Sequence, residues 1–562
     1  MPAAVCALIP QHRWLAPARA LVPGLASLLA ACGGGGGDPA PPPPPPEPTV
    51  VTRALASGPT LVAAGCTGGR SGGTVFVDAE VEPFVAASPL NPDLLVGTWQ
   101  QDRASNGGAR ALATAVSMDG GRSWQRALQP LSRCGGAVAG SAGDHERASD
   151  PWVDIGPTGT VFMMGLAFSG NNLQPGSSSA MLAQRSLDGG RSWSDPVSLQ
   201  RDGETLFNDK NTLTADPLDA RFVYAVWDRL DTAGRGPTLL ARSIDGGANW
   251  EPAREIYAPQ VAGGISQTIA NRIVVLTDGP ERGLLVNAFV QVDTVGTRST
   301  NTVRVMRSSD RGLTWSAPVT VAEQRSVGTL DPETGDPVRD GAIVPTVAAG
   351  PGGLLWLAWQ DARFSNGARD AIALSRSADG GRTWSAPVAV NRNADVAAFT
   401  PALHVRADGM VGLMHMDLRS NTSDRGSLLA DLWLLSSRDG TTWAETALER
   451  GFDLRRAPSA AGGLFLGDYH GLVSTRGQFL GLAAVAGPDS ANRSDVLAWR
   501  TAGSPAMPFT ARPARLNALA GADRERLDRS ASEATARWME QRLPGWTGRV
   551  QQPPARVSEP AR

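Results

Sequence analysis

The sequence has little cysteine, histidine and tyrosine, and no excess of charge of either sign. Its 562 residues include four cysteines, five histidines and three tyrosines, and 52 Lys and Arg are offset by 54 Asp and Glu. No basic run interleaves with aromatic residues, which argues against a nucleic-acid-binding surface. The histidines do not cluster at the spacing of metal ligands, so neither a metal site nor a cofactor is expected. With 42% hydrophobic residues, the chain can still bury a large core.

Long apolar runs are absent after residue 32, so no transmembrane helix is expected there. In residues 1–32, a basic segment with Arg13 and Arg19 leads into the apolar run "LVPGLASLLAAC", which has the form of a secretory signal. The end of this run resembles the bacterial lipobox, in which the cysteine, here Cys32, becomes the lipidated N-terminus. An ordinary cleaved signal with an incidental cysteine is the alternative. Residues 1–32 are therefore predicted to be a lipoprotein signal peptide, and the Gly- and Pro-rich residues 33–49 a tether.

This N-terminus predicts export, with a lipid anchor at a bacterial membrane, periplasmic or at the cell surface, as the only membrane contact. In an oxidising compartment, the two cysteines that remain, Cys66 and Cys134, are expected to form a disulfide. Two separate buried thiols are the alternative, because a sequence does not show how far apart two sulfurs lie.

One short motif, S-x-D-x-G-x-x-W, recurs along the chain. It occurs as "SMDGGRSW" (117–124), "SLDGGRSW" (186–193), "SIDGGANW" (243–250), "SSDRGLTW" (308–315), "SADGGRTW" (377–384) and the less regular "SSRDGTTW" (436–443). An interval of roughly sixty residues is typical of a repeat architecture. In the last copy Arg438 stands where the others have Asp and Asp439 comes one place late, so a looser turn is expected there.

The residues between copies read as short strands separated by turns. The clearest stretch, residues 343 to 388, gives three β-rich runs, then the motif, then a fourth run, and no helical period competes with them. Four antiparallel strands per unit, repeated radially, predict an all-β fold, a β-propeller. In each turn from third to fourth strand, the Asp carboxylate can accept hydrogen bonds from free backbone N–H groups, and Gly supplies positive φ.

The repeated motif resembles the Asp-box, or bacterial neuraminidase repeat, and the chain is similar to the sialidase-like propeller superfamily over about residues 75 to 503. The resemblance implies the fold more than the activity, because Asp-boxes occur in sialidases, other glycoside hydrolases and non-catalytic propellers. We therefore expect a propeller over residues 50–503 and a C-terminal tail, 504–562, with one helix near 521–543 outside the propeller.

The strand count predicts seven blades, with the family's commoner six as the alternative. Inner strands are expected to begin near Val81, Trp152, Thr212, Arg272, Pro345, Ala402 and His470. A propeller must cover its edge strands, usually by completing the last blade with a strand from the other terminus. The segment "TLVAAGC" (60–66) or "TVFVDAE" (74–80) is the candidate for that strand.

The face opposite the Asp-boxes would be built from second-to-third strand loops and from connections between blades. The loops carry four pairs: Asp102 with Arg103, Asp228 with Arg229, Asp361 with Arg363, and Asp417 with Arg419. In one interpretation each Asp caps its loop and each Arg bridges to the next blade. In the other, some of these arginines point inward and bind an anionic or polyhydroxylated ligand.

Acids and bases for hydrolysis would come from the connections between blades. Tyr469, which precedes the last inner strand, resembles the sialidase nucleophile, and sialidases are an exception to catalysis by two carboxylates. Asp468 is a candidate base for it, and Asp150 or Asp340 a candidate acid. The chain departs from the family in two ways: no Phe-Arg-Ile-Pro-like sequence precedes the first Asp-box, and no Glu follows on the strand after Tyr469.

Two classes of function remain after these observations. The first is a non-catalytic propeller, expected to be a monomer, that binds a glycan or a cell-surface protein on the face opposite the Asp-boxes. The second is a sialidase-like glycoside hydrolase. The scaffold motifs outnumber the catalytic ones, which favours the binding module.

Overall fold

The all-β class predicted from the sequence is confirmed. The computed structural model describes residues 50–68, 73–502, 508–514 and 521–542. Cys32, the signal segment and the predicted tether lie outside the described residues. Within them, no helix is long and apolar enough to cross a membrane.

Most strands belong to four-stranded antiparallel units whose strands pair in chain order. Unit 1 contains β2 (Glu80–Ala87), β3 (Leu95–Arg103), β4 (Ala109–Ser117) and β5 (Gln125–Gln129). Unit 2 contains β6 (Arg147–Ile155), β7 (Val161–Ser169), β8 (Ser178–Ser186) and β9 (Val197–Asp202). Unit 3 contains β10 (Leu206–Ala215), β11 (Val223–Asp231), β12 (Thr238–Ser243) and β13 (Arg254–Tyr257), and unit 4 contains β14 (Ile265–Val275), β15 (Leu285–Val295), β16 (Arg298–Ser308) and β17 (Val319–Gln324).

The later units follow the same plan. Unit 5 contains β20 (Thr346–Ala349), β21 (Leu355–Asp361), β22 (Ala371–Ser377) and β23 (Val388–Ala389). Unit 6 contains β24 (Ala398–Val405), β25 (Val411–Asp417), β26 (Leu429–Ser437) and β27 (Thr442–Asp453), and unit 7 contains β30 (Gly471–Thr475), β31 (Gln478–Ala486), β32 (Ser494–Ala502) and β1 (Val50–Leu55). Short C-terminal strands extend two units: β33 (Phe509–Thr510) pairs with β27, and β34 (Arg512–Pro513) pairs with β23.

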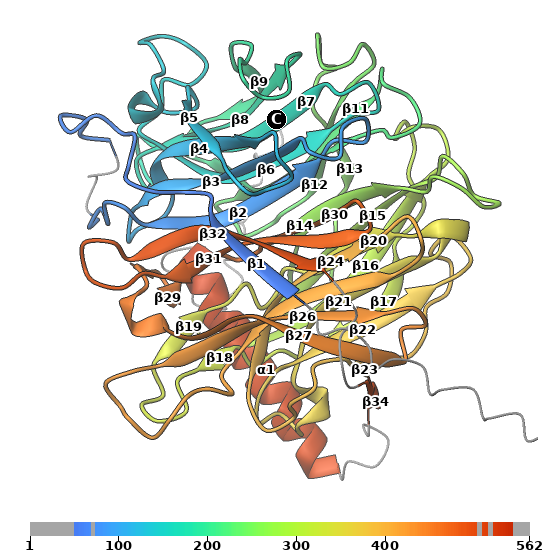
Figure 1. Ribbon diagram of the computed structural model, residues 1–562. Coiled ribbons are helices and arrows are strands. Elements are labelled where there is room, and N and C mark those ends of the chain that lie inside the picture. The colour runs from blue at the N-terminus through green and yellow to red at the C-terminus, as the bar shows by residue number, and fades with distance from the viewer. Residues whose placement is uncertain (1–49, 69–72, 503–507, 515–520, 543–562) are drawn as a thin grey trace, which may run out of the picture. The chain divides into compact units, whose positions relative to one another are not determined.

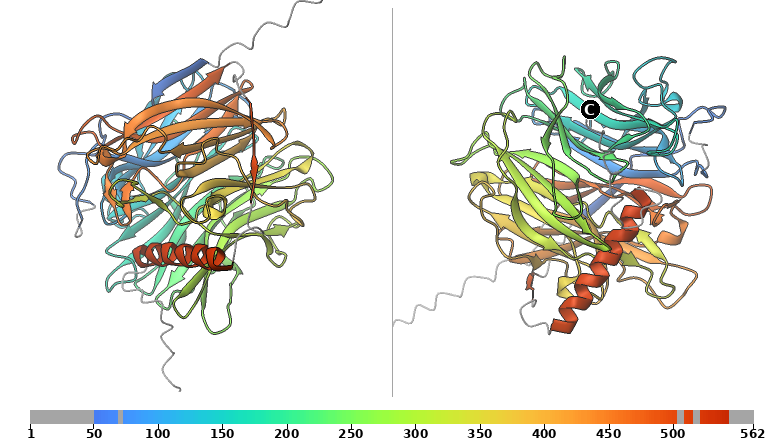
Figure 2. Two further views of the ribbon diagram at one scale, coloured as in Figure 1. Left: turned by 90° about the horizontal axis from the view of Figure 1, so that it is seen from below. Right: turned by 180° about the vertical axis from the view of Figure 1, so that it is seen from behind.

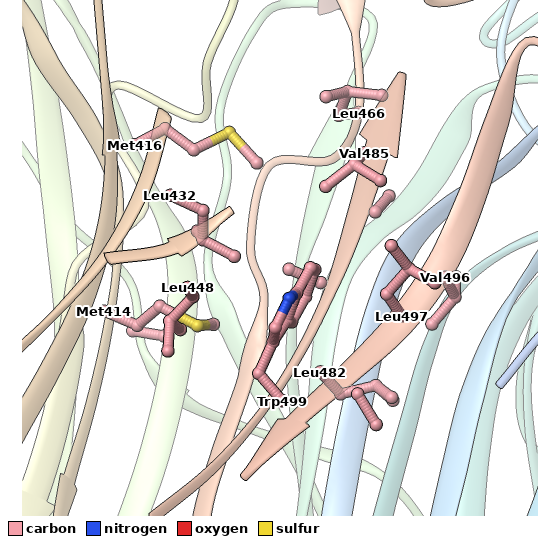
Figure 3. Close-up of a cluster of buried hydrophobic side chains, with 14 of the residues drawn as sticks. Met414, Met416, Leu432, Leu448, Leu466, Leu482, Val485, Val496, Leu497 and Trp499 are labelled. Atoms are coloured by element: carbon pink, nitrogen blue, oxygen red, sulfur yellow. The ribbon is translucent and has the colours of Figure 1, made fainter. Parts of the chain in front are cut away.

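The first strands of these units form a closed ring. Each of β2, β6, β10, β14, β20 and β24 contacts the next, β24 contacts β30, and β30 contacts β2 (Figure 1). Every inner strand contains, or begins directly after, the residue near which the sequence predicted its start. Figure 3 shows how neighbouring units pack: Met414 and Leu432 of unit 6 meet Leu482 and Trp499 of unit 7 in one apolar cluster. Such burial between units is the main stabilising contribution in a ring of sheets.

The strand that completes unit 7 differs from both predicted segments. It is β1, which pairs antiparallel with β32 from Val50 opposite Ala502 to Leu55 opposite Leu497. Its sequence, "VVTRAL", is rich in β-branched residues, as suits a strand. Residues 60–66 instead lie near unit 1, where the predicted disulfide between Cys66 and Cys134 is confirmed, with Cα atoms 5.7 Å apart. Cys134 belongs to the short helix η1 (Arg133–Gly135), between β5 and β6.

The Asp-box turns share one hydrogen-bond pattern. In the first, the Ser117 hydroxyl donates to Asp119 Oδ1 (2.8 Å), which accepts from the backbone N–H of Arg122 (2.9 Å) and Ser123 (3.0 Å). Although desolvation opposes them, these bonds hold the pKa of Asp119 at about 2. The expectation of a looser turn at the last Asp-box was wrong. There Ser437 takes the role of the first serine, Asp439 Oδ1 accepts two backbone N–H bonds, both of 2.7 Å, and the turn is one residue shorter.

The turns from third to fourth strand and the loops from second to third strand lie on opposite faces, because neighbouring strands are antiparallel. We call the second face, which also carries the connections between units, the connection face. Two long connections there pair with each other, since β19 (Pro337–Arg339) runs parallel to β29 (Gly463–Phe465), flanked by β18 (Thr329–Leu330) and β28 (Ser459–Ala460). Short helices η2 (Pro351–Gly353), η3 (Ala362–Phe364) and η4 (Leu454–Arg456) lie in other turns.

The tail helix is present but does not lie apart from the propeller. Helix α1 (Gly521–Arg542) packs on the connection face across units 3 to 5 (Figure 2). Ser532 Oγ accepts from the Ser299 N–H (2.8 Å), and Thr535 Oγ1 accepts from Asn301 Nδ2 (2.9 Å). The buried side chains of Leu527 and Met539 contact the same surface.

Candidate functional site

Five of the seven inner strands carry a β-bulge near the connection face, and the bulges in β2, β6 and β10 position charged side chains. The strand register shifts between Val81 and Phe84 in β2, between Ser149 and Trp152 in β6, and between Asp209 and Thr212 in β10. The bulges place Glu82, Asp150 and Lys210 at φ of 53°, 51° and 49°. Residues with side chains rarely adopt positive φ, and bulges re-aim a side chain next to a site. All three side chains meet inside the ring of inner strands.

Lys210 is the centre of this cluster and the only lysine in the sequence. Its Nζ lies 2.6 Å from Asp468 Oδ2 and 3.5 Å from both Glu82 Oε1 and Asp150 Oδ2. Arg339 Nη2 reaches the same Asp468 oxygen at 2.7 Å. A compact ammonium group can contact three carboxyl groups at once, whereas the planar guanidinium of Arg is less suited to that arrangement. Sequence analysis did not select Lys210, although its uniqueness was a signal for it.

The cluster separates its carboxyl groups by charge state. Burial raises the pKa of Glu82 to about 8 despite the nearby Lys210, so this carboxyl is protonated at neutral pH. Burial also acts to raise the pKa of Asp468, but Arg339 and Lys210 outweigh it and hold that pKa below its usual range. Lys210 and a hydrogen bond from Ser149 likewise lower the pKa of Asp150. Lys210 therefore pairs with two ionised aspartates and one neutral acid.

Arg103, predicted as a ligand-binding residue, lies beside this cluster without a carboxylate of its own. Its Nη1 donates to Gln100 Oε1 (2.6 Å), its guanidinium lies 4.6 Å from the Phe465 ring centre, and its Nε has no partner. Among the described residues, none forms an ion pair with Arg103, which is 2% exposed. Burial and the neighbouring Arg339 lower the pKa of Arg103 to about 10, so it stays charged at neutral pH.

A cavity of about 100 Å³ opens in front of Arg103. Four cations from four segments line it: Arg103 of β3, Lys210 of β10, Arg339 of β19 and Arg542 of α1. Its other lining groups are the aromatic residues Phe168, Phe207 and Trp538, the polar residues Asn106, Asn172 and Ser149, and the acids Asp150 and Asp209. An arginine cluster at a concave, partly aromatic surface is suited to an anionic ligand.

Helix α1 supplies Arg542, which the sequence did not connect with the site. Arg542 Nε lies 2.9 Å from Asp209 Oδ2, Nη1 donates to Gln267 Oε1 (2.7 Å), and Nη2 pairs with Asp228. The arginine side chain and that of Asp228 are almost fully buried. Asp228 therefore forms its ion pair with Arg542 of the tail helix rather than with its loop neighbour Arg229.

The other loop arginines do not reach the cavity, so their predicted inward orientation was wrong. Arg363 folds back onto Asp361 (Nη2 to Oδ2, 2.7 Å) and donates to the Glu323 carbonyl of unit 4. Arg419 pairs with its own unit, at 2.6 Å from Asp417 Oδ2 and 2.8 Å from Glu445 Oε2.

The remaining loop residues are also structural. Arg229 lies 3.8 Å from Asp202 of unit 2, and Asp102 accepts from Arg110 Nη1 (3.1 Å) and from the Asp78 N–H (3.1 Å). The alternative interpretation fits in part: Asp361 and Asp417 cap their loops, and Arg229 and Arg363 bridge to the neighbouring unit. Arg419 stays within its own unit, and Asp228 pairs with the tail helix.

The geometry argues against Tyr469 as a nucleophile. Its hydroxyl donates to the Pro151 carbonyl (3.0 Å), its ring packs on Trp152 with centres 5.4 Å apart, and the residue is 8% exposed. Burial, followed by the nearby carboxyls, raises its pKa well above 10, which disfavours the phenolate.

The position of Asp340 also argues against its predicted role as the general acid. It accepts from the Thr329 N–H (2.8 Å) and from Gln360 Nε2 (3.0 Å), and does not line the 100 Å³ cavity. No group of three His, Cys, Asp or Glu side chains in the described part of the chain could hold a metal ion.

The raised pKa of Glu82 makes stability depend on pH. The folded protein keeps this proton up to about pH 8, whereas the ordinary pKa of an exposed Glu is 4.5. Its contribution is therefore full below pH 4.5 and is lost as the pH rises towards 8. Glu82→Gln should flatten the fall in urea midpoint between pH 5 and 9, whereas Glu255→Gln, on the exposed surface, should leave it unchanged. Parallel curves for wild type and Glu82→Gln would contradict the assignment.

Comparison with known proteins adds little to this geometry. No protein-family model and no curated protein matches the sequence. Similar solved structures include a Hadza microbial sialidase (18% identity over 60% of this chain, TM-score 0.38). Others are the leech intramolecular trans-sialidase (15% identity, 79% of this chain and 70% of that chain, TM-score 0.38) and a Fusarium graminearum α-L-arabinofuranosidase (11% identity, 80% and 97%, TM-score 0.42).

This chain spans 63% of the length of the Hadza sialidase. Identities and TM-scores this low do not assign an activity. The resemblance to sialidase-like propellers holds for the fold, which rests on the strand order and the closed ring of this chain.

Proposed function

We propose that the protein binds an anionic saccharide, a sugar ring bearing a carboxylate, in the cavity in front of Arg103. The observation that carries this proposal is the charged, buried guanidinium of Arg103, which faces the cavity without an ion-pair partner among the described residues. A buried charge is costly unless paired, and a carboxylate matches a guanidinium in a bidentate manner. Arg339 and Arg542 add positive charge to the same cavity.

The remaining lining groups favour a sugar over a bare inorganic ion. Trp538, Phe168 and Phe207 offer apolar ring faces, and Asn172 and Ser149 offer hydrogen-bonding groups for hydroxyls. Small-molecule sites typically combine such aromatic walls with a few placed polar groups. A cell-surface glycoprotein carrying such a sugar is the natural partner class.

Hydrolysis of a glycosidic bond is the second candidate, supported by a pair of acids in the same cavity. Burial raises the pKa of Asp209, although Arg542 and Lys210 oppose it, while the pKa of Asp150 is lowered. Two carboxyl groups whose pKa values are shifted in opposite directions are the usual general acid and base of glycosidases. In this scheme Asp209 donates the proton to the leaving oxygen and Asp150 acts as carboxylate.

Calorimetric titration tests the binding proposal. Wild type should bind 3′-sialyllactose or glucuronic acid and ignore lactose, and Arg103→Met should weaken binding at least about tenfold, the loss of one charged hydrogen bond. Arg103→Met should fold, because it orphans no carboxylate, and Arg229→Met is the matched control on the same face. Absence of binding to any acidic sugar would overturn the proposal.

A separate assay tests the hydrolase. Turnover of aryl glycosides that Asp209→Asn abolishes, with saccharide binding retained, would establish it.

We further propose that the protein is exported and lipid-anchored through Cys32. The lipobox-like "LAAC" and the Gly- and Pro-rich residues after it support this. In a bacterial host, Cys32→Ser should move the protein from the detergent-extracted membrane fraction to the soluble fraction. A wild-type protein already soluble without detergent would contradict the anchor.

A further inference from the structure

A second cavity, of about 30 Å³, lies among the inner strands and is separate in its lining from the cavity at Arg103, apart from Lys210. All seven units border it, and its lining includes Phe84 of β2, Trp152 of β6, Arg272 of β14, Thr346 of β20 and His470 before β30. It therefore sits where the ring of inner strands closes. Neither the proposed saccharide site nor the Asp-boxes account for its polar groups.

Arg272 brings a positive charge to this cavity without a direct counter-ion. Its Nη1 donates to Thr346 Oγ1 (3.1 Å), and its guanidinium lies 5.5 Å and 5.2 Å from the ring centres of Phe84 and Trp152. No described residue forms an ion pair with Arg272. Burial lowers its pKa to about 10, which leaves it charged at neutral pH.

The nearest acid, Asp154, is engaged elsewhere. Its side chain accepts hydrogen bonds from the backbone N–H groups of Ala215 (2.9 Å) and Ile155 (2.8 Å). Burial raises the pKa of Asp154 to about 6, so the group is mostly ionised at neutral pH, but its hydrogen bonds go to the backbone and it forms no direct ion pair with Arg272. The cavity thus contains a buried cation that no described carboxylate contacts directly, an arrangement that a bound anion would stabilise.

His470 adds a second donor to the cavity. The residue is 3% exposed, and both of its ring nitrogens lack a hydrogen-bond partner. Burial lowers its pKa to about 3, so the ring is neutral and carries one N–H. Buried polar groups are normally satisfied, which makes an acceptor between His470 and Arg272 the missing element.

We propose that this cavity is a binding site for a small monovalent anion of the chloride class, held by Arg272 and by the N–H of His470. A cavity of this size accommodates about one water-sized particle, so a sugar acid is excluded. A water molecule could accept from His470 but would not neutralise Arg272. Since all seven units border the cavity, the anion would stabilise the closure of the ring and thereby the folded protein.

Halide substitution in crystals of the wild-type protein gives the direct test. Crystals grown in sodium bromide should show an anomalous peak between Arg272 and His470. In solution, the melting temperature in sodium chloride should exceed that in sodium gluconate of equal ionic strength by a few degrees. Arg272→Met should abolish this difference, and Arg500→Met, a control on the outer part of unit 7, should keep it.

A featureless or water-only cavity in bromide, together with equal melting temperatures in chloride and gluconate, would overturn the site. If Arg272→Met fails to fold, His470→Leu should reduce the halide dependence instead, and the bromide peak in the wild type remains decisive. None of these results depends on whether the protein binds a saccharide.

Discussion

Replacement of Lys210 by methionine should destabilise the protein by about 3–5 kcal/mol, the usual cost of removing one partner from a buried ion pair. Arg339 would still neutralise Asp468, but Asp150 would be left ionised, buried and without its cation. Urea unfolding followed by tryptophan fluorescence at pH 7 measures the change. Lys210→Arg should recover only part of it, because a planar guanidinium does not fit among three carboxyl groups.

The double variant Lys210→Met, Asp150→Asn identifies the source of that cost. If the orphaned aspartate is the cause, the second substitution should restore most of the lost stability, and the two changes should be strongly non-additive. A single Lys210→Met variant within 1 kcal/mol of wild type, an effect of ordinary surface size, would contradict the central role of the lysine.

Replacement of Arg542 by methionine should release helix α1 from the connection face. The substitution leaves Asp209 and Asp228 without the guanidinium that pairs with them. The expected loss is again about 3–5 kcal/mol, here in the free energy of docking the helix rather than of unfolding the whole protein. Amide hydrogen exchange over residues 521–542 should accelerate by about a hundredfold or more, since each 1.4 kcal/mol is a factor of ten. Trp538 would leave the cavity wall, so saccharide affinity should fall in parallel.

The exposed Arg529 of the same helix provides the matched control, because Arg529→Met removes an equal charge without a buried partner. Adding Asp228→Asn to Arg542→Met should restore part of the protection. Exchange in α1 that is unchanged in Arg542→Met would show that Leu527, Thr535 and Met539 alone hold the helix.

Much of the fold was predictable because it is local and repeated. The short β-rich runs and the Asp-box turns specify β-sheet units wherever they occur, and the position of the inner strands follows from them. The closing strand was harder to identify, since what makes β1 the closing strand is its long-range pairing with β32, which the local sequence does not specify. The last Asp-box was misjudged because deletion of one residue shifts the serine that begins the turn from Ser436 to Ser437.

The site was less predictable, because backbone irregularities determine it. A β-bulge shifts the register and so changes the face to which a side chain points, and no sequence pattern told us that Lys210 would turn towards Asp468. Arg363 was a reasonable candidate until Asp361 proved to accept from its backbone N–H (2.9 Å). The docking face of α1 mixes Leu527, Thr535, Met539 and Arg542, so it lacks the apolar stripe that signals a packed helix.

Because Lys210 is the only lysine, its reaction with amine-directed reagents can report when the centre of the propeller opens. Amine-directed reagents need a neutral, accessible amine, whereas the Lys210 side chain is 7% exposed and the surrounding carboxyls, acting against burial, raise its pKa. Apart from the terminal amine, acylation would therefore mark a molecule in which the Lys210 amine has become accessible, through local opening at the centre of the ring or through unfolding. Acylation measured by intact mass would time that event directly, without the competing surface lysines found in most proteins.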